Sequence, residues 1–261
     1  MNFDNLPCDI KRMIFDCNRE AAQIENNKKR PSLYLPDEWP TYFTKSKGYK
    51  VYDLDNVEYN DLIFAVGTNV LGYSNNAINS AVKKSISKGN MTSLNCSEEV
   101  ILAEKLIEIH PWSKMVRFAR SGGEANAIAI RIARAASNKD NIAVCGYHGW
   151  HDWYLAANIG NAKNLNNHLI SQLKPKGIPI SLKNSSIPFN YNSFEELENI
   201  TNNNKIGIIK MEVSRNIKPE KNFLKKVRQL ATKKNIILIF DECTSGFRQT
   251  YGGIHKIFKV N

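Results

Sequence analysis

The stretch Ile236–Glu242, IILIFDE, is apolar at five successive positions before two acids close it. A strand buried on both faces of a parallel sheet has this pattern, because helices cover both of its sides. Similar stretches occur at residues 141–147 (NIAVCGY) and 205–213 (KIGIIKMEV), and helix-like stretches alternate with them. The alternation predicts an α/β fold, with an open, mostly parallel sheet and helices on both faces.

The other expected elements follow from hydrophobic periodicity. They are a hairpin or small meander at 49–64, helices at 75–89, 97–110, 123–137 and 223–235, and a strand at 115–120. Residues 1–48 are expected to form a helical N-terminal segment with a proline-bearing connector, and residues 49–261 a large domain. The polar stretch 158–203 is weakly periodic, which indicates either an excursion over the site or a surface insertion.

The composition indicates a folded protein without nucleic-acid or membrane partners. With 261 residues, 42% of them hydrophobic, the chain can bury a sizeable core. Its net charge of +11 comes from scattered lysines, without a basic helix, so nucleic-acid binding is not expected. No apolar run approaches the roughly 18 residues of a membrane span, and the cysteines show no C-x-x-C spacing. A cytoplasmic location is expected.

The strand expected at 115–120 runs into Ser121, Gly122 and Gly123, and a helix follows. Glycines let a ligand approach the backbone closely, and the first turn of a helix presents unpaired N–H groups. This turn therefore suits a phosphate, with the Ser121 hydroxyl as an additional donor. The alternative is an ordinary strand-to-helix turn, since the glycine spacing matches neither the P-loop nor the dinucleotide fingerprint.

Aromatic and histidine side chains follow the next strand, in VCGYHGWHDWY. Tyr147 lies at the carboxyl end of a parallel strand, where its ring is placed to cover a planar ligand. One alternative is that the aromatic residues simply pack in the core or an interface. Another is a metal held by His148, His151 and Asp152, which is disfavoured because one loop supplies too few ligands. We therefore expect no metal site.

Acids end the last two strands. Asp241 closes an apolar strand, and a buried carboxylate there is costly unless it meets a cation or hydrogen-bond donors, such as a protonated ring nitrogen. Glu212 ends the neighbouring strand, where a surface lysine is the alternative partner, and Glu242 is interpreted as a solvated acid on the opposite face from Asp241. A phosphate-binding turn, an aromatic ring and a carboxylate at strand ends together fit pyridoxal phosphate.

Three motifs in this order and spacing resemble the class III aminotransferases of fold type I, most closely the glutamate-1-semialdehyde 2,1-aminomutase branch. They are RFARSGGEANAIAIRIARA (117–135), VCGYHGWHDWY (144–154) and LIFDECTSGFRQTYGGIHKIFKV (238–260). The resemblance covers residues 49–261. It implies amino-group transfer by pyridoxal phosphate on a small amino or keto substrate, and a homodimer.

The resemblance also implies the roles of individual residues. The serine and two glycines would hold the cofactor phosphate, Tyr147 would stack on the ring, and Asp241 would pair with the ring nitrogen. The full set of expected cofactor-binding residues is Ser121, Gly122, Gly123, Tyr147, His148, Glu212 and Asp241.

The sequence departs from the family pattern at three positions of these motifs. Gly123 stands where the family often has serine or threonine, which removes one hydroxyl from the phosphate turn. Cys243 replaces a common valine behind the ring, and Val213 replaces a common proline. We expect backbone donors to compensate at the first position and the volume change at the second to be tolerated.

The Schiff-base lysine of the family is expected beyond Asn261. Lys256 and Lys259 are the lysines that follow Asp241, and they lie in an expected amphipathic helix leading away from the site. The chain is therefore expected to be a truncated large domain without the C-terminal small domain, inactive alone and completed by a C-terminal half. The alternative is a non-catalytic binding or assembly protein, or the product of a decaying gene.

Overall fold

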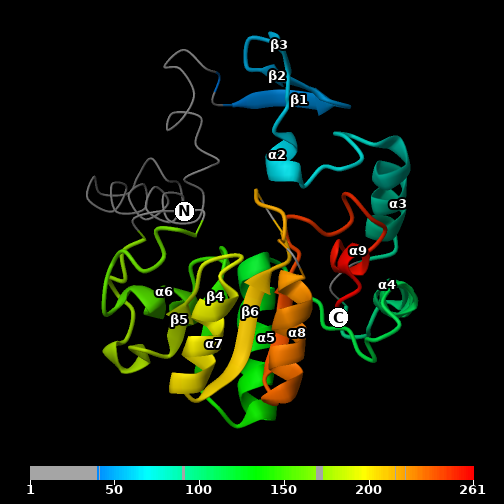
Figure 1. The fold of residues 1–261 in the computed structure, drawn as a ribbon. Helices are drawn as coiled ribbons and strands as arrows, with labels where there is room; N and C mark the ends of the chain where they lie inside the picture. Colours follow the sequence, from blue (N-terminus) through cyan, green and yellow to red (C-terminus); the bar gives the residue numbers. More distant parts are fainter. Residues whose placement is uncertain (1–39, 41, 90–91, 169–172, 215, 221) are drawn as a thin grey trace. The chain divides into compact units, whose positions relative to one another are not determined.

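The computed structural model describes residues 40, 42–89, 92–168, 173–214, 216–220 and 222–261 (Figure 1). The chain divides into two compact units, with the boundary between Cys96 and Ser97. The N-terminal segment expected at 1–48 lies mostly outside the described residues. The domain boundary expected after residue 48 stays a prediction.

The first unit contains a small antiparallel meander, which confirms the hairpin or meander expected at 49–64. Asp53 makes the turn between its second and third strands, because Oδ1 accepts from the backbone N–H groups of Asp55 and Val57, each at 2.9 Å. Asn75 caps the longer helix of this unit, Asn76–Ser87, by accepting from two N–H groups of its first turn. The elements of this unit are β1 (Phe43–Lys47), β2 (Lys50–Asp53), β3 (Glu58–Asn60), α2 (Phe64–Gly67) and α3 (Asn76–Ser87).

The second unit contains a four-stranded sheet in the order β5-β4-β6-β7, and every pair of neighbouring strands is parallel. The α/β fold with an open parallel sheet is therefore confirmed. The strands are β4 (Asn141–Cys145), β5 (Ser186–Pro188), β6 (Ile206–Glu212) and β7 (Ile237–Asp241).

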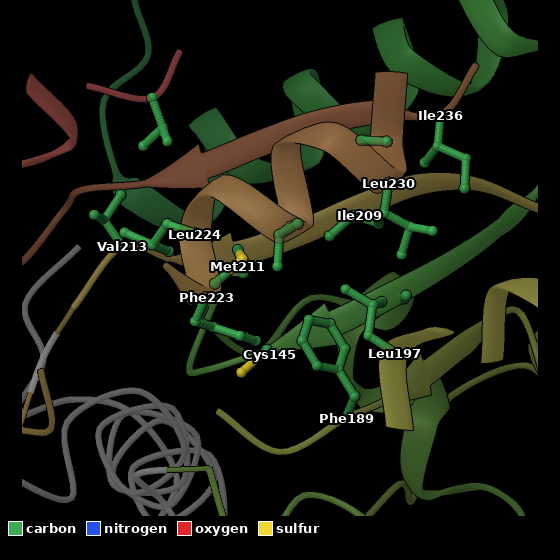
Figure 2. Packing of buried hydrophobic residues seen from close by; sticks show 14 of the residues in the cluster. Cys145, Phe189, Leu197, Ile209, Met211, Val213, Phe223, Leu224, Leu230 and Ile236 are labelled. Carbon is green, nitrogen blue, oxygen red and sulfur yellow. The ribbon is translucent and has the colours of Figure 1, made fainter. Parts of the chain in front are cut away.

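Helices cover both faces of this sheet, with α7 and α8 on one face and α5 on the other (Figure 1). On the first face, Phe223 of α8 and Leu197 of α7 pack with Met211 of β6 and Cys145 of β4 (Figure 2). The helices are α4 (Ser97–Ile109), α5 (Gly122–Ser137), α6 (Asp152–Leu155), α7 (Phe194–Asn203), α8 (Phe223–Lys233), α9 (His255–Phe258) and the 3-10 turns η3 (Ala156–Asn158) and η4 (Ile180–Leu182).

One expectation from the sequence and one of its alternatives are wrong. Residues 115–120 form no strand, since within the described part of the chain no neighbouring strand pairs with them, and Met115 is 86% exposed. Of the two interpretations of the stretch 158–203, the plain surface insertion is wrong, because its described residues supply the outer strand β5 to the sheet and α7 to one of its faces. A three-residue strand that ends in Pro188 is too short for a period-2 signal.

No helix among the described residues is long and apolar enough to cross a membrane.

Candidate functional site

The carboxyl ends of β4, β6 and β7 meet at one edge of the sheet. Their register aligns Cys145 with Met211 and Glu212 with Asp241. In an open parallel sheet, the segments that follow these ends form the usual ligand site. Three parts of the chain converge here: the start of α5, the loop after β4 and the loop after β7.

Ser121 caps the start of α5, and its hydroxyl accepts from the N–H of Glu124 at 3.2 Å. The two glycines that follow are surrounded closely. A Cβ on Gly122 would lie 3.0 Å from Sγ of Cys243, and a Cβ on Gly123 would lie 2.6 Å from Cε1 of His151. Glycine is therefore needed where the helix start meets both loops.

An unsatisfied donor or acceptor lies beside this turn. Nδ1 of His151 is buried and has no hydrogen-bond partner among the described residues. Gly149, with a positive φ of 94°, brings the loop after β4 against Gly123, because a Cβ at Gly149 would lie 3.3 Å from the Gly123 Cα. A compact turn with open helix N–H groups and an orphaned imidazole nitrogen fits a phosphate group.

Asp241 is a buried carboxylate that accepts four hydrogen bonds, and the residue is 6% exposed. Oδ2 accepts from Nδ2 of Asn126 at 2.8 Å, Nδ1 of His148 at 2.9 Å and Nζ of Lys210 at 3.2 Å. Oδ1 accepts from the backbone N–H of Cys243 at 3.0 Å. A carboxylate has about four lone-pair sites, so Oδ1 retains capacity for one further donor.

These contacts determine the charges at the centre of the site. Burial opposes ionisation of Asp241, yet the hydrogen bond from His148 and the charge of Lys210 hold its pKa well below the usual range. Burial lowers the pKa of His148 to about 4, and the charge of Lys210 acts in the same direction. Asp241 is therefore an anion and His148 a neutral ring at neutral pH.

Tyr147 and Glu212 are joined through the backbone. Oε2 of Glu212 accepts from the N–H of Tyr147 at 3.2 Å, and Glu212 is 6% exposed. The half-buried Tyr147 ring makes an edge contact with Tyr154, with ring centroids 6.1 Å apart. Glu212 thus holds the start of the loop after β4, and an exposed lysine is not its partner in this contact.

The structure places the predicted residues in two layers. Ser121 is exposed at the helix start, with Gly122 and Gly123 half-buried behind it, whereas His148 is fully buried and contacts Asp241 from within the protein. The sequence reasoning missed two members of the site, Asn126 and Lys210. A lysine inside an apolar strand was the signal for the second.

Glu242 is not a solvated acid, contrary to the expectation. Its side chain is 13% exposed and accepts from the N–H groups of Ile254 at 2.8 Å and His255 at 2.9 Å. It also accepts from Nδ1 of His255 at 2.6 Å. Glu242 therefore ties the glycine-bearing loop after β7 to the end of that strand.

The two lysines after Asp241 lie at α9. Nζ of Lys256 donates to the backbone oxygen of Ile109 at 3.1 Å, and Lys259 is exposed just after the helix. Among the described residues, no group of three or more histidine, cysteine or acidic side chains is placed to hold a metal ion.

Comparisons with known proteins agree with this fold and these motifs. Residues 36–254 match the sequence profile of the class III aminotransferase family. The chain is 35% identical over 241 residues to 3-aminobutyryl-CoA aminotransferase of Cloacimonas acidaminovorans, and 32% identical over 230 residues to glutamate-1-semialdehyde 2,1-aminomutase of Methanobrevibacter smithii. A solved structure of an omega-transaminase from Sphaerobacter thermophilus superposes with a TM-score of 0.77 at 25% identity.

The chain spans about half the length of these curated relatives. The first alignment covers 89% of this chain and 54% of the relative, and the second covers 85% and 53%. The omega-transaminase comparison covers 94% of this chain and 58% of that structure. Because the family match extends over residues 36–254, the chain belongs to the class III aminotransferase family.

Proposed function

We propose that the edge of the sheet around Asp241 binds pyridoxal phosphate for amino-group transfer on a small amino or keto substrate. The observation that carries this proposal is the convergence on Asp241 of donors from three chain segments. Asn126 comes from the helix that opens with the phosphate turn, His148 from the loop after β4 and Lys210 from β6. Such a carboxylate stays ionised and can hold a proton on a ring nitrogen.

Each residue has a separate task in this proposal. Ser121, Gly122 and Gly123 bind the phosphate through the hydroxyl and the open N–H groups of α5. Tyr147 covers the ring, and Glu212 holds the Tyr147 backbone in place. When bound, the cofactor supplies an electron sink that stabilises negative charge on the substrate carbon.

Asp241 and His148 form the inner part of the site. Asp241 holds a proton at the ring nitrogen, while His148 orients the carboxylate through the hydrogen bond to Oδ2. Lys256 and Lys259 are not proposed as cofactor-bonding amines, because the first donates to a backbone oxygen and the second is exposed in water. A reactive amine must be desolvated beside the ring. A homodimer, or a complementing polypeptide, is proposed to supply the remaining groups.

Direct binding tests this proposal without requiring turnover. We would titrate the purified chain with 4′-deoxypyridoxine 5′-phosphate, which lacks the aldehyde and so binds independently of any lysine. Ser121→Asp keeps a helix cap but adds a negative charge at the phosphate turn, and we expect at least tenfold weaker binding. Ser121→Asn is the matched control without added charge.

The second arm of the experiment concerns the ring. Asp241→Asn is expected to weaken binding of the same probe at least tenfold, whereas Asp140→Asn, at the opposite edge of the sheet, should leave it unchanged. Circular dichroism confirms that each variant is folded. The proposal would be overturned if the unaltered chain did not bind the probe, or if the Ser121→Asp and Asp241→Asn variants bound it as tightly as the unaltered chain.

A further inference from the structure

Lys210 is a charged side chain in an apolar layer. Lys210 on β6 pairs with Val144 of β4 and with Ile239 of β7, and these three residues form one row across the sheet. The next row on the same face consists of Ile142, Ile208 and Ile237. The other five members of these rows are apolar and belong to the core that packs under α5. Lys210 itself is 1% exposed. A buried ammonium group is costly, so its side chain needs a specific partner.

That partner is Asp241. Within the part of the chain that the structure describes, Nζ of Lys210 has one hydrogen-bond acceptor, Oδ2 of Asp241 at 3.2 Å. The register explains the contact, because Asp241 lies beside Glu212, two residues along β6 from Lys210 and on the same face. The Asp241 carboxylate and the Lys210 ammonium group thus neutralise each other inside the protein.

His148 shows the effect of this cation. Nδ1 lies 2.9 Å from Oδ2 of Asp241 and Nε2 lies 3.0 Å from the backbone oxygen of Cys145, so both ring nitrogens face acceptors. A neutral imidazole has a single N–H for these two oxygens. Burial and the charge of Lys210 nevertheless lower the pKa of His148, which keeps the ring neutral.

We infer that Lys210 is a positioning residue that sets the charge of the Asp241 carboxylate and thereby limits how tightly a bound pyridine nitrogen holds its proton. The inference rests on the proposed function and names a residue outside the predicted cofactor set. The charged or titratable groups that face Lys210 are Asp241 and Cys243 from β7 and its loop, His148 from the loop after β4, and Glu212 from its own strand. From α5 the contact with Asp241 is the uncharged Asn126.

The sign of the effect follows from Coulomb's law. A cation beside the carboxylate opposes a second positive charge on the ring nitrogen and a positive charge on His148. Removing the cation therefore favours protonation at both places. Lys210→Met retains the side-chain length in the apolar row and removes only the charge and its donors.

The first measurement uses the chain without any ligand. NMR titration of the His148 ring should show that its pKa rises in Lys210→Met by about one unit or more, a tenfold gain in proton affinity. Lys139→Met is the matched control, because Lys139 is exposed and its Nζ lies near the Ile206 backbone oxygen, at the other end of β6. It should leave the His148 titration unchanged.

The second measurement follows the ring nitrogen. The ¹⁵N shift of 4′-deoxypyridoxine 5′-phosphate labelled at the ring nitrogen reports its protonation when bound. We expect its pKa to rise at least about one unit in Lys210→Met and not in Lys139→Met. An unchanged His148 titration, or an unchanged ring-nitrogen pKa in a folded Lys210→Met variant that binds the probe, would overturn the role of Lys210.

Two further outcomes are distinguishable. If the unaltered chain does not bind the probe, the proposed function fails and the ring-nitrogen role fails with it, whatever the ligand-free titration shows. If Lys210→Met does not fold, the double variant Lys210→Met/Asp241→Asn, which removes both buried charges, should fold. An unfolded double variant would contradict the charge pairing.

Discussion

Nδ1 of His148 and Oδ2 of Asp241 lie 2.9 Å apart, although 93 positions separate the two residues in the chain. The contact joins the loop after β4 to the end of β7 across the intervening strand β6. Both residues are buried, with relative exposures of 1% and 6%. The pair therefore couples protonation at the site to the stability of the sheet.

The folded chain should lose stability in mild acid because His148 is buried as a neutral ring. The unfolded chain takes up a proton near pH 6.5, whereas burial holds the pKa of the folded ring at about 4. The free energy of unfolding should therefore be flat above pH 6.5 and fall by about 3 kcal/mol toward pH 4. Asp241, with its lowered pKa, acts in the same direction but at lower pH.

Urea unfolding at a series of pH values from 7 to 4.5 measures this slope. In His148→Asn the slope should be smaller, and it should not vanish, because burial also lowers the pKa of His168. Equal slopes in the two proteins would show that His148 does not carry the acid sensitivity.

Asn126→Asp should place a second carboxylate against Asp241. The amide nitrogen of Asn126 now donates to Oδ2 at 2.8 Å, and its replacement by an acid exchanges a donor for a like charge. We expect a loss of about 2 kcal/mol or more at pH 7, because one of two adjacent carboxylates resists ionisation. Stability should partly recover as the pH falls to about 5, opposite to the unaltered chain.

Asn126→Ala serves as the control, since it removes the donor without adding a charge. Its unfolding free energy should also fall, but without recovery in acid. A pH profile of Asn126→Asp parallel to that of Asn126→Ala would argue against direct contact with the Asp241 carboxylate.

The strands with long apolar runs were predictable, and so was the edge where their acids meet. Asp241 and Glu212 were found because strand ends in a parallel sheet share one edge. Lys210 and Asn126 were not, because their contacts with Asp241 depend on strand register and on the rotation of α5. The lysine inside an apolar strand indicates a buried charge, but neither contact with Asp241 can be read from spacing along the chain.

Two errors in the fold have the same origin. Residues 115–120 are largely apolar and look like a strand, but a strand exists only where a neighbour supplies hydrogen bonds. Residues Ser186–Pro188 show no clear pattern, yet they pair with β4 in register at the sheet edge. In both cases, pairing with a segment distant in the sequence determines whether a strand forms, and the local sequence pattern does not show this pairing.

Gly123→Ala should destabilise the chain although alanine favours a helix. A Cβ at this position would lie 2.6 Å from Cε1 of His151, so the ring or the helix start must move. We expect a net loss of about 1–3 kcal/mol in the free energy of unfolding. In the background His151→Ala, the same substitution should instead gain about 0.5–1 kcal/mol, the ordinary helix preference of alanine over glycine.

A double-mutant cycle by urea unfolding separates these terms. The control is Gly160→Ala, where, among the residues that the structure describes, a Cβ would meet only Cε of Lys183 at 3.7 Å. If Gly123→Ala costs the same with and without the His151 ring, the close approach of the loop after β4 to α5 is not the cause.

Glu242→Ala should release the loop after β7 without unfolding the sheet. The carboxylate accepts from the N–H groups of Ile254 and His255 and from the His255 ring, so its loss leaves these donors unpaired. Hydrogen bonds to a charged acceptor contribute roughly 1.5–3 kcal/mol each, so amide exchange at residues 254 and 255 should accelerate at least about tenfold. Amides of β6 should keep their protection, because Glu242 lies outside that strand.

Hydrogen exchange followed by NMR resolves these amides individually. Glu198→Ala, on the exposed side of α7, removes a carboxylate of the same size and should change neither region. Equal acceleration in β6 and at residues 254 and 255 would mean that Glu242 stabilises the whole unit. Unchanged exchange at these two residues would mean that the loop is held by other contacts, such as the Lys256 bond to the Ile109 backbone oxygen.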